Sequence, residues 1–339
     1  MADHLTTSNE CPDCAPLSRR GFVKTTAAAL AALTAAGGAA RSLLADEKKP
    51  ASETLVAQLH SSLTEQQRKA ICFDFDHPLR SRVENNWNIV KPTISDFFTK
   101  DQQALIKDIF MSLHSDEYAQ RVLHQVEHDS SDIGGFGACS VALFGEPGPD
   151  KKFEFVFTGR HVTRRCDGNS VEGAAFGGPI FYGHAAKSFN EKPDHPENVY
   201  WYQGLRANEV FKALNGKQRE MSLRTDSRPE RGTDTVKLAG KGGAMHGVPM
   251  TELSADQKDL VRKVMSDVLA PFRKVDADEA MKFIEADGGF DQLHMAFYKN
   301  MDIGNDGVWD VWQIEGPSMV WYFRGAPHVH TWVNIRARS

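Results

Sequence analysis

The spacing of the hydrophobic residues changes near residue 139, and this change restricts the fold more than any other feature of the sequence. Before it, apolar residues recur three and four positions apart, which predicts helices over residues 52–70, 99–113 and 115–128. After it, short apolar runs bounded by Gly, Pro and Asp predict strands over residues 139–144, 153–166 and 171–181. Strands that follow one another this closely are typical of an antiparallel meander.

The second half of the chain mixes both patterns, without a recognisable sequence repeat. We expect helices over residues 204–214, 254–269 and 276–286, and strands over residues 308–314, 319–324 and 329–335. His294, beside Met295 and Phe297, is expected in the core on a helix, and the polar residues 228–247 predict a long loop near the mouth of a site. The sequence therefore predicts an α+β fold with a mainly antiparallel sheet packed with several helices.

The N-terminus has the pattern of a twin-arginine export signal. Ser18-Arg19-Arg20-Gly21-Phe22 is followed by uncharged residues 25–40, which have the length of a signal h-region. A membrane helix needs about 20 apolar residues, so this stretch is too short to span a bilayer. We expect residues 1–45 to be a leader read by the twin-arginine (Tat) translocase, and residues 46–339 to be a single periplasmic or secreted globular domain with no stable membrane anchor after cleavage.

Composition narrows the possible partners and sites. The formal net charge of −5 and the pI near 6.2 lack the basic excess of nucleic-acid-binding proteins, so we expect no nucleic-acid partner. Cys11 and Cys14 fall in the leader, which leaves Cys72, Cys139 and Cys166 in the mature chain. Three cysteines form at most one disulfide, and their wide separation does not indicate a thiolate metal site.

Motifs along almost the whole mature chain resemble one family of exported proteins, known only as the domain of unknown function DUF3500. Its landmarks are Phe73-Asp74-Phe75-Asp76, Asn86-Trp87, Ala142-Leu143-Phe144-Gly145-Glu146-Pro147, Gly159-Arg160-His161-Val162, Gly247-Val248-Pro249, Ile314-Glu315-Gly316-Pro317 and His328-Val329-His330-Thr331-Trp332. Arg160 departs from the family pattern, which usually has a His at that position. The resemblance implies no activity, so any mechanism has to come from the residues.

The histidines are the best candidates for chemistry. His328 and His330 are two residues apart, so on a strand both point to one face, and His161 is the best candidate for a third metal ligand. Period-two alternation over residues 153–166 would let His161 converge with this pair. The pair could equally be an ordinary surface or hydrogen-bonded feature. His184 is a candidate fourth ligand or acid/base residue. His124 and His128 are four residues apart, and a solvated helix face is favoured for them.

These residues favour a metal-dependent enzyme, with His161, His328 and His330 as ligands and Arg160, Glu315 and His184 as catalytic residues that orient or protonate a substrate. Copper or non-haem iron is favoured over hydrolytic zinc because no carboxylate adjacent in sequence suggests a general base. The alternative is a non-catalytic exported protein that binds a small organic ligand or a metal. Phosphate-loop, Gly-x-Ser-x-Gly and His-Glu-x-x-His motifs are absent from the sequence.

Replacing Arg19 and Arg20 together by Lys is expected to abolish export while leaving the protein folded in the cytoplasm. The reason is that the translocase reads the paired guanidinium groups, which take no part in the core. Fractionation of the host cells measures this outcome, and periplasmic accumulation of the double variant at the wild-type level would contradict the export signal.

Overall fold

The computed structural model describes residues 51–148, 150–184, 195, 197–302 and 307–337. The expected leader, residues 1–45 with its Cys11 and Cys14, lies outside these residues. Residues 50–147 and 152–339 form one compact unit, and the description below concerns this unit. None of the helices in the described ranges is both long and apolar enough to cross a bilayer.

A mostly antiparallel sheet of eleven strands runs through the unit as far as it is described. Its order is β1-β2-β3-β4-β5-β11-β10-β9-β8-β6, with β7 paired to β8. The strands are β1 (Cys72–Phe73), β2 (Ser140–Gly145), β3 (Phe153–Gly159), β4 (Val162–Cys166), β5 (Ile180–His184), β6 (Leu223–Arg224), β7 (Val248–Pro249), β8 (His294–Tyr298), β9 (Val311–Glu315), β10 (Met319–Arg324) and β11 (Val329–Ile335). Within the described chain, the parallel pairs are β1 with β2 and β6 with β8.

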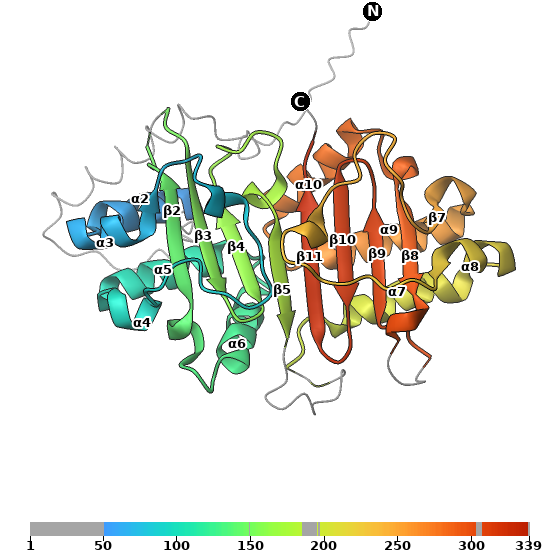
Figure 1. The fold of residues 1–339 in the computed structure, drawn as a ribbon, viewed down its shortest axis with the longest axis horizontal. Coiled ribbons are helices and arrows are strands. Elements are labelled where there is room, and N and C mark those ends of the chain that lie inside the picture. Colours follow the sequence, from blue (N-terminus) through green and yellow to red (C-terminus); the bar gives the residue numbers. More distant parts are fainter. Residues whose placement is uncertain (1–50, 149, 185–194, 196, 303–306, 338–339) are drawn as a thin grey trace, which may run out of the picture. The chain divides into compact units, whose positions relative to one another are not determined.

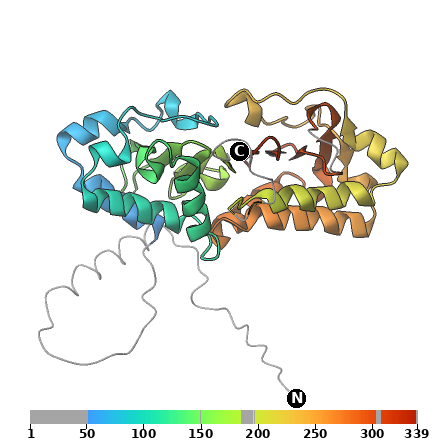
Figure 2. The same cartoon turned by 90° about the horizontal axis from the view of Figure 1, so that it is seen from below.

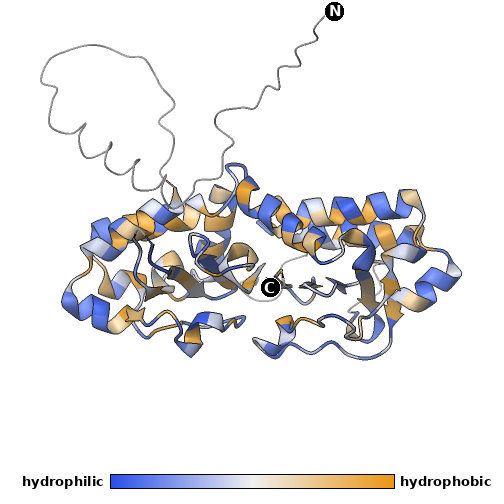
Figure 3. Ribbon diagram, turned by 90° about the horizontal axis from the view of Figure 1, so that it is seen from above, coloured by the Kyte–Doolittle hydropathy of each residue, from blue (hydrophilic) through white to orange (hydrophobic). Residues whose placement is uncertain are grey.

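Helices cover one face of this sheet, and irregular segments lie over the other (Figure 2). The α-helices are α2 (Ser52–Ser62), α3 (Glu65–Ile71), α4 (Ile94–Phe97), α5 (Lys100–Ser112), α6 (Ala119–Asp129), α7 (Trp201–Ala213), α8 (Gly216–Ser222), α9 (Ala255–Leu269) and α10 (Lys274–Ala286). They carry both hydrophobic and hydrophilic residues, as helices with one face on a sheet should (Figure 3). The α+β prediction with a mainly antiparallel sheet is confirmed.

The element order reveals an internal repeat that the sequence did not show. Read from its two edges, the sheet has the same pattern on both sides of the β5–β11 pair (Figure 1). We call residues 52–184 the N-half and residues 201–335 the C-half. In each half, two helices lead into a short edge strand. Further helices follow, and then a four-stranded antiparallel meander whose first strand pairs in parallel with the edge strand.

Matching hydrogen bonds support this repeat. Gly135 N donates to Ser130 O after α6, and Gly289 N donates to Ile284 O after α10. Ile94 N donates to Cys139 O in the N-half, as Met250 N donates to Leu293 O in the C-half. The first glycine of both Gly-Gly pairs also has a positive φ, 114° at Gly134 and 103° at Gly288. Because these constraints act on the backbone, they persist while most side chains differ between the halves.

A pair of buried glutamines locks the helices of each half together. Gln67 and Gln102 exchange side-chain hydrogen bonds of 2.8 and 3.1 Å, and each also completes the capping box of its own helix, α3 or α5. Gln218 and Gln257 do the same for α8 and α9, with distances of 2.9 and 2.8 Å. Each amide therefore satisfies both a helix terminus and its partner without access to water.

Three local predictions were wrong. The single strand expected over residues 153–166 is a hairpin, because a two-residue turn at Arg160-His161 separates β3 from β4. The strand expected over residues 171–181 begins only at Ile180, because residues 175–177 form a 3-10 turn in which Phe176 has a φ of 56°. His294 lies on a strand, β8, and not on a helix. Short apolar runs do not distinguish these alternatives.

Replacing Gln257 by Ala is expected to destabilise the protein by about 1–3 kcal/mol, because the Gln218 amide would remain buried without its partner. The same loss is expected for Gln102→Ala in the N-half. The free energy of unfolding from denaturant titration measures both effects. Gln66→Ala, at an exposed position on α3, serves as the matched control, and equal stability of the Gln66 and Gln257 variants would contradict the assigned role.

Candidate metal site

The candidate site lies at the end of the pair of strands that joins the two halves. His330 of β11 pairs with Gly183 of β5, and His328 lies two residues earlier on the same chain segment. His161 comes from the β3–β4 turn of the N-half with a φ of 55°, a left-handed backbone conformation. Gly183 N donates a 3.0 Å hydrogen bond to His161 O, which ties this turn to the junction between the halves.

Gly183 has to be a glycine for this approach. A Cβ atom at this position would collide with the carbonyl oxygen of Val329 and would lie 3.4 Å from the Cβ of His161. Without a side chain between them, the turn that carries His161 reaches β11 directly.

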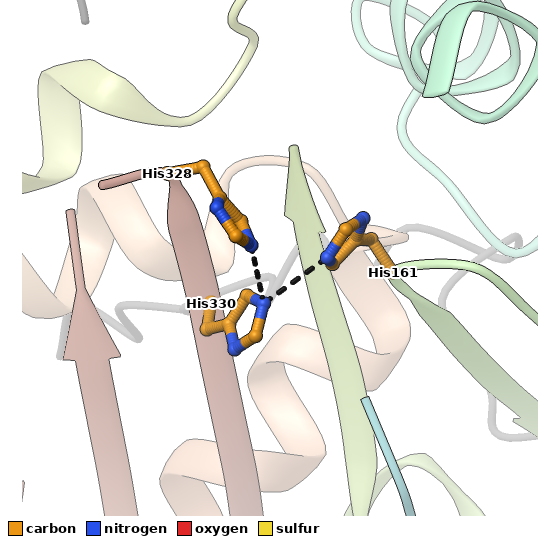
Figure 4. Close-up of side chains that lie close together, drawn as sticks. All are labelled: His161, His328 and His330. Carbon is orange, nitrogen blue, oxygen red and sulfur yellow. Dashed lines mark hydrogen bonds between the residues drawn. The ribbon is translucent and has the colours of Figure 1, made fainter. Parts of the chain in front are cut away.

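The three imidazoles point their Nε2 atoms toward one another (Figure 4). Nε2 of His330 lies 3.0 Å from Nε2 of His161 and 2.8 Å from Nε2 of His328. One nitrogen from each ring can be chosen so that all three lie within 4.8 Å of one another. Two nitrogen ligands about 2.1 Å from a metal and at right angles are about 3 Å apart, so the spacing fits a shared ion. The predicted proximity of the three histidines is confirmed, although a turn and not strand alternation delivers His161.

Carboxylates stand behind two of the rings. Oε2 of Glu230 lies 2.6 Å from Nδ1 of His330. Oδ2 of Asp129, the last residue of α6, lies 3.3 Å from Nδ1 of His161, an electrostatic contact outside good hydrogen-bond geometry. A carboxylate next to Nδ1 favours the proton on that nitrogen and leaves the Nε2 lone pair for a metal. Nε2 atoms 2.8–3.0 Å apart share a proton in one tautomer, and with the protons on Nδ1 their lone pairs converge on one point where a cation fits.

Burial keeps the histidines in the form that binds metals. His161 and His330 are buried, and His328 is partly exposed. Burial, with the nearby His161 and Arg324, lowers the pKa of His328 to about 3. Burial and Arg324 also hold the pKa of His330 well below its usual value. Both rings are therefore neutral at neutral pH, and a neutral imidazole is the metal-binding form.

The pKa values of the two carboxylates shift in opposite directions. Burial raises the pKa of Glu230, and the charge of Arg324 offsets this only in part. Burial also acts to raise the pKa of Asp129, but its close contacts with His161 and His184 outweigh this effect, so the pKa of Asp129 is lower than usual. Asp129 is thus a fixed negative charge at the edge of the site.

His184, predicted as a catalytic residue, lies near the site but behind its ligands. Its Nδ1 is 2.9 Å from Oδ1 of Asp129, so one carboxylate contacts both His184 and His161. The other face of the His184 ring stacks on His128, with ring centroids 5.6 Å apart. His184 is therefore placed to position Asp129.

The other two predicted catalytic residues, Arg160 and Glu315, do not point at the three histidines as expected. Arg160 neighbours the site, but its Nη1 donates to the carbonyl oxygen of Asp129 at 2.8 Å and pairs with Asp132 at 2.7 Å. Glu315 is not at the site: its neighbours across the sheet place it four residues along the strands and two strands away from His330, roughly 16 Å by strand geometry. Its Oε1 accepts a 2.8 Å hydrogen bond from His246 instead. Sequence adjacency to a landmark motif could not reveal which end of the sheet Glu315 occupies.

The other histidines and the cysteines considered from the sequence lie outside the histidine site. His124 and His128, on one face of α6, both contact Glu197 at 3.0 Å. Cys72, Cys139 and Cys166 are free, and burial raises the pKa of the Cys139 thiol to about 12.

Sequence reasoning missed Asp129, Glu230 and Arg324, which surround the three histidines. Glu230 falls in residues 228–247, which were predicted to approach a site, but no pattern distinguished it from its neighbours. Asp129 follows His128 on a helix whose face was interpreted as solvated. Only the packing of α6 and this loop against the sheet brings both carboxylates to the histidines.

Comparisons with known proteins identify a family but no activity. A family model described as "Protein of unknown function (DUF3500)" matches residues 46–337 of the chain. No curated protein and no solved structure matches the chain.

The metal-free protein is expected to lose stability as the pH falls from about 6.5, the usual pKa of His, toward about 3, the folded-state pKa of His328. In this window a histidine is protonated in the unfolded chain and neutral in the folded site. Each such histidine lowers the free energy of unfolding by up to about 1.4 kcal/mol per pH unit as the pH falls. In the His328→Gln variant, unfolding should take up about one proton fewer in this pH window, so the stability should fall less steeply with pH. Denaturant titrations between pH 7.5 and 4, with a chelator present, measure it. His124→Gln is the matched control, since its side chain is 57% exposed; an unchanged pH slope in the His328 variant would contradict the burial of a neutral ring.

Proposed function

The chain belongs to the DUF3500 family, and from its histidine site we propose that it is a metalloprotein in which His161, His328 and His330 bind one transition metal ion through Nε2. The observation that carries this proposal is the convergence of the three Nε2 atoms, with carboxylates behind two of the rings. Outer carboxylates of this kind are the usual second layer of histidine metal sites, where they fix the tautomer and strengthen the ligand.

The ligand set supports catalysis more than a purely structural role. Imidazole suits zinc, copper and iron. Three protein ligands leave at least one coordination position for a substrate or water, whereas structural sites are closed by four. Glu230 and Asp129 already contact imidazole nitrogens, so neither is poised as a base for a metal-bound water. The proposal is therefore a metal-dependent enzyme with a redox centre of copper or iron, favoured over hydrolytic zinc.

Export is part of the proposal. The twin-arginine route carries folded proteins, often those that receive a cofactor in the cytoplasm, and this is compatible with a metal site built from both halves of the fold. His161 belongs to the N-half and His330 to the C-half, so the site requires a folded chain. A periplasmic or secreted protein loaded before export is consistent with both features.

A non-catalytic protein that binds a metal or a small organic ligand is the second candidate. The burial of His161 and His330 favours it, because only His328 among the three ligands is open to an incoming molecule. The two candidates share the same ligands and differ in whether the metal turns over a substrate.

Protein matured in its own host is expected to contain close to one equivalent of metal per chain, and His161→Ala, His328→Ala and His330→Ala are each expected to lose it. Glu230→Gln should weaken metal binding about 10- to 100-fold, because it removes the charge behind His330. Elemental analysis of purified protein, together with competition against a chelator, measures both effects.

Two controls sharpen this test. A variant with Cys72, Cys139 and Cys166 replaced by Ser should retain the metal, since these side chains lie outside the histidine site. His124→Ala should also retain it. Folded wild-type protein that contains no metal and takes none up would sink the proposal, and metal loss in the cysteine variant would show that the ligands are different.

A further inference from the structure

Arg324, the last residue of β10, lies beside the histidine site. It pairs directly with His330 across the β10–β11 ladder, and directly paired side chains project from the same face with Cβ atoms about 5 Å apart. Its Nε lies 3.4 Å from Oε1 of Glu230, whose other oxygen holds His330. One glutamate therefore connects the arginine to a metal ligand.

The guanidinium group of Arg324 is short of hydrogen-bond acceptors. Its buried Nε has no hydrogen-bond partner, and no hydrogen bond joins its side chain to any part of the described chain. Neighbouring arginines differ: Arg160 and Arg228 donate to carbonyl or side-chain oxygens at 2.7–2.8 Å. A buried donor without an acceptor is costly, and Nε is such a donor. The side chain is 19% exposed and its two Nη groups are not buried atoms of this kind, so they face water, which a ligand acceptor would replace.

The charge of the site points to the same kind of ligand. A divalent ion and Arg324 bring three positive charges, whereas the adjacent Asp129 and Glu230 bring at most two negative ones. The three histidines are neutral ligands. An uncompensated positive charge in a largely buried site is unfavourable, and one anionic group would balance it.

We propose that Arg324 and the metal together bind a carboxylate, so that the substrate or ligand of this site is a small organic acid. This inference rests on the metal site proposed above. A planar carboxylate matches the guanidinium fork in shape and charge. Entry is possible on the side of His328 and Arg324, because His328 is partly exposed and the Arg324 side chain is 19% exposed. Arg324 thereby takes the substrate-orienting role first expected of Arg160, whose Nη1 is already occupied.

The test uses the full mature chain loaded with cobalt(II) and titrated with acetate in a calorimeter, with acetamide as the neutral probe of the same shape. Wild-type protein is expected to bind acetate and to bind acetamide much more weakly. Arg324→Gln should weaken acetate binding roughly 10- to 100-fold, the effect of losing hydrogen bonds to a charged group. Arg324→Lys should give an intermediate loss, because it keeps the charge and loses the fork.

Arg336→Gln is the matched control, because it removes one exposed positive charge at the other end of β11, and it should leave acetate binding unchanged. Cobalt content and the thermal midpoint are measured for every variant. Cobalt uptake with acetate binding that does not depend on Arg324, or with no acetate binding at all, overturns this inference and leaves the metal site standing. Failure of wild-type protein to take up cobalt refutes the metal site itself, and this inference with it.

Discussion

The antiparallel pairing of β5 with β11 is the interaction on which the rest of the structure depends. It runs from Val329 opposite His184 to Val333 opposite Ile180. In the described chain it is the sheet contact through which the N-half and the C-half become one sheet. The same pairing sets His330 opposite Gly183, and Gly183 in turn holds the His161 turn by its amide. The histidine site is therefore a consequence of how the halves join.

The repeat relates the turn that carries His161 to a turn in the C-half that carries a serine. Gly183 N bonds to His161 O in the N-half, and at the related position Arg336 N bonds to Ser318 O in the C-half. Ser318 thus occupies the position in the C-half that His161 occupies in the N-half. The buried glutamine pairs are present in both halves, whereas the histidine is not. The packing and capping contacts are repeated in both halves, whereas the histidine cluster lies at one end of the junction.

The electrostatics of the site follow from burial. Removing water lowers the pKa of His328 and His330, so both present lone pairs at neutral pH. Glu230 and Asp129 stabilise the rings from behind, and Arg324 adds a positive charge on the open side. Under the proposals made above, a cation on the three Nε2 atoms gives the site an excess of positive charge, which an organic anion would balance.

The sequence by itself determined the fold class, most helix positions and the histidines that meet. Period-two and period-3.6 patterns are local, so β10 and β11 were predicted at Met319–Arg324 and Val329–Ile335, their observed bounds, and the helix predicted over residues 254–269 is α9. Tertiary structure alone decided the internal repeat, the turn that presents His161, and the arrival of Asp129, Glu230 and Arg324. These depend on which strands pair and on which loops cover them. Some of these contacts join residues far apart in sequence, such as His330 and Glu230, which are 100 positions apart, and no local periodicity encodes them. Glu315 was expected near the histidines because its motif is a family landmark. The strand register places it at the other end of the strands from them.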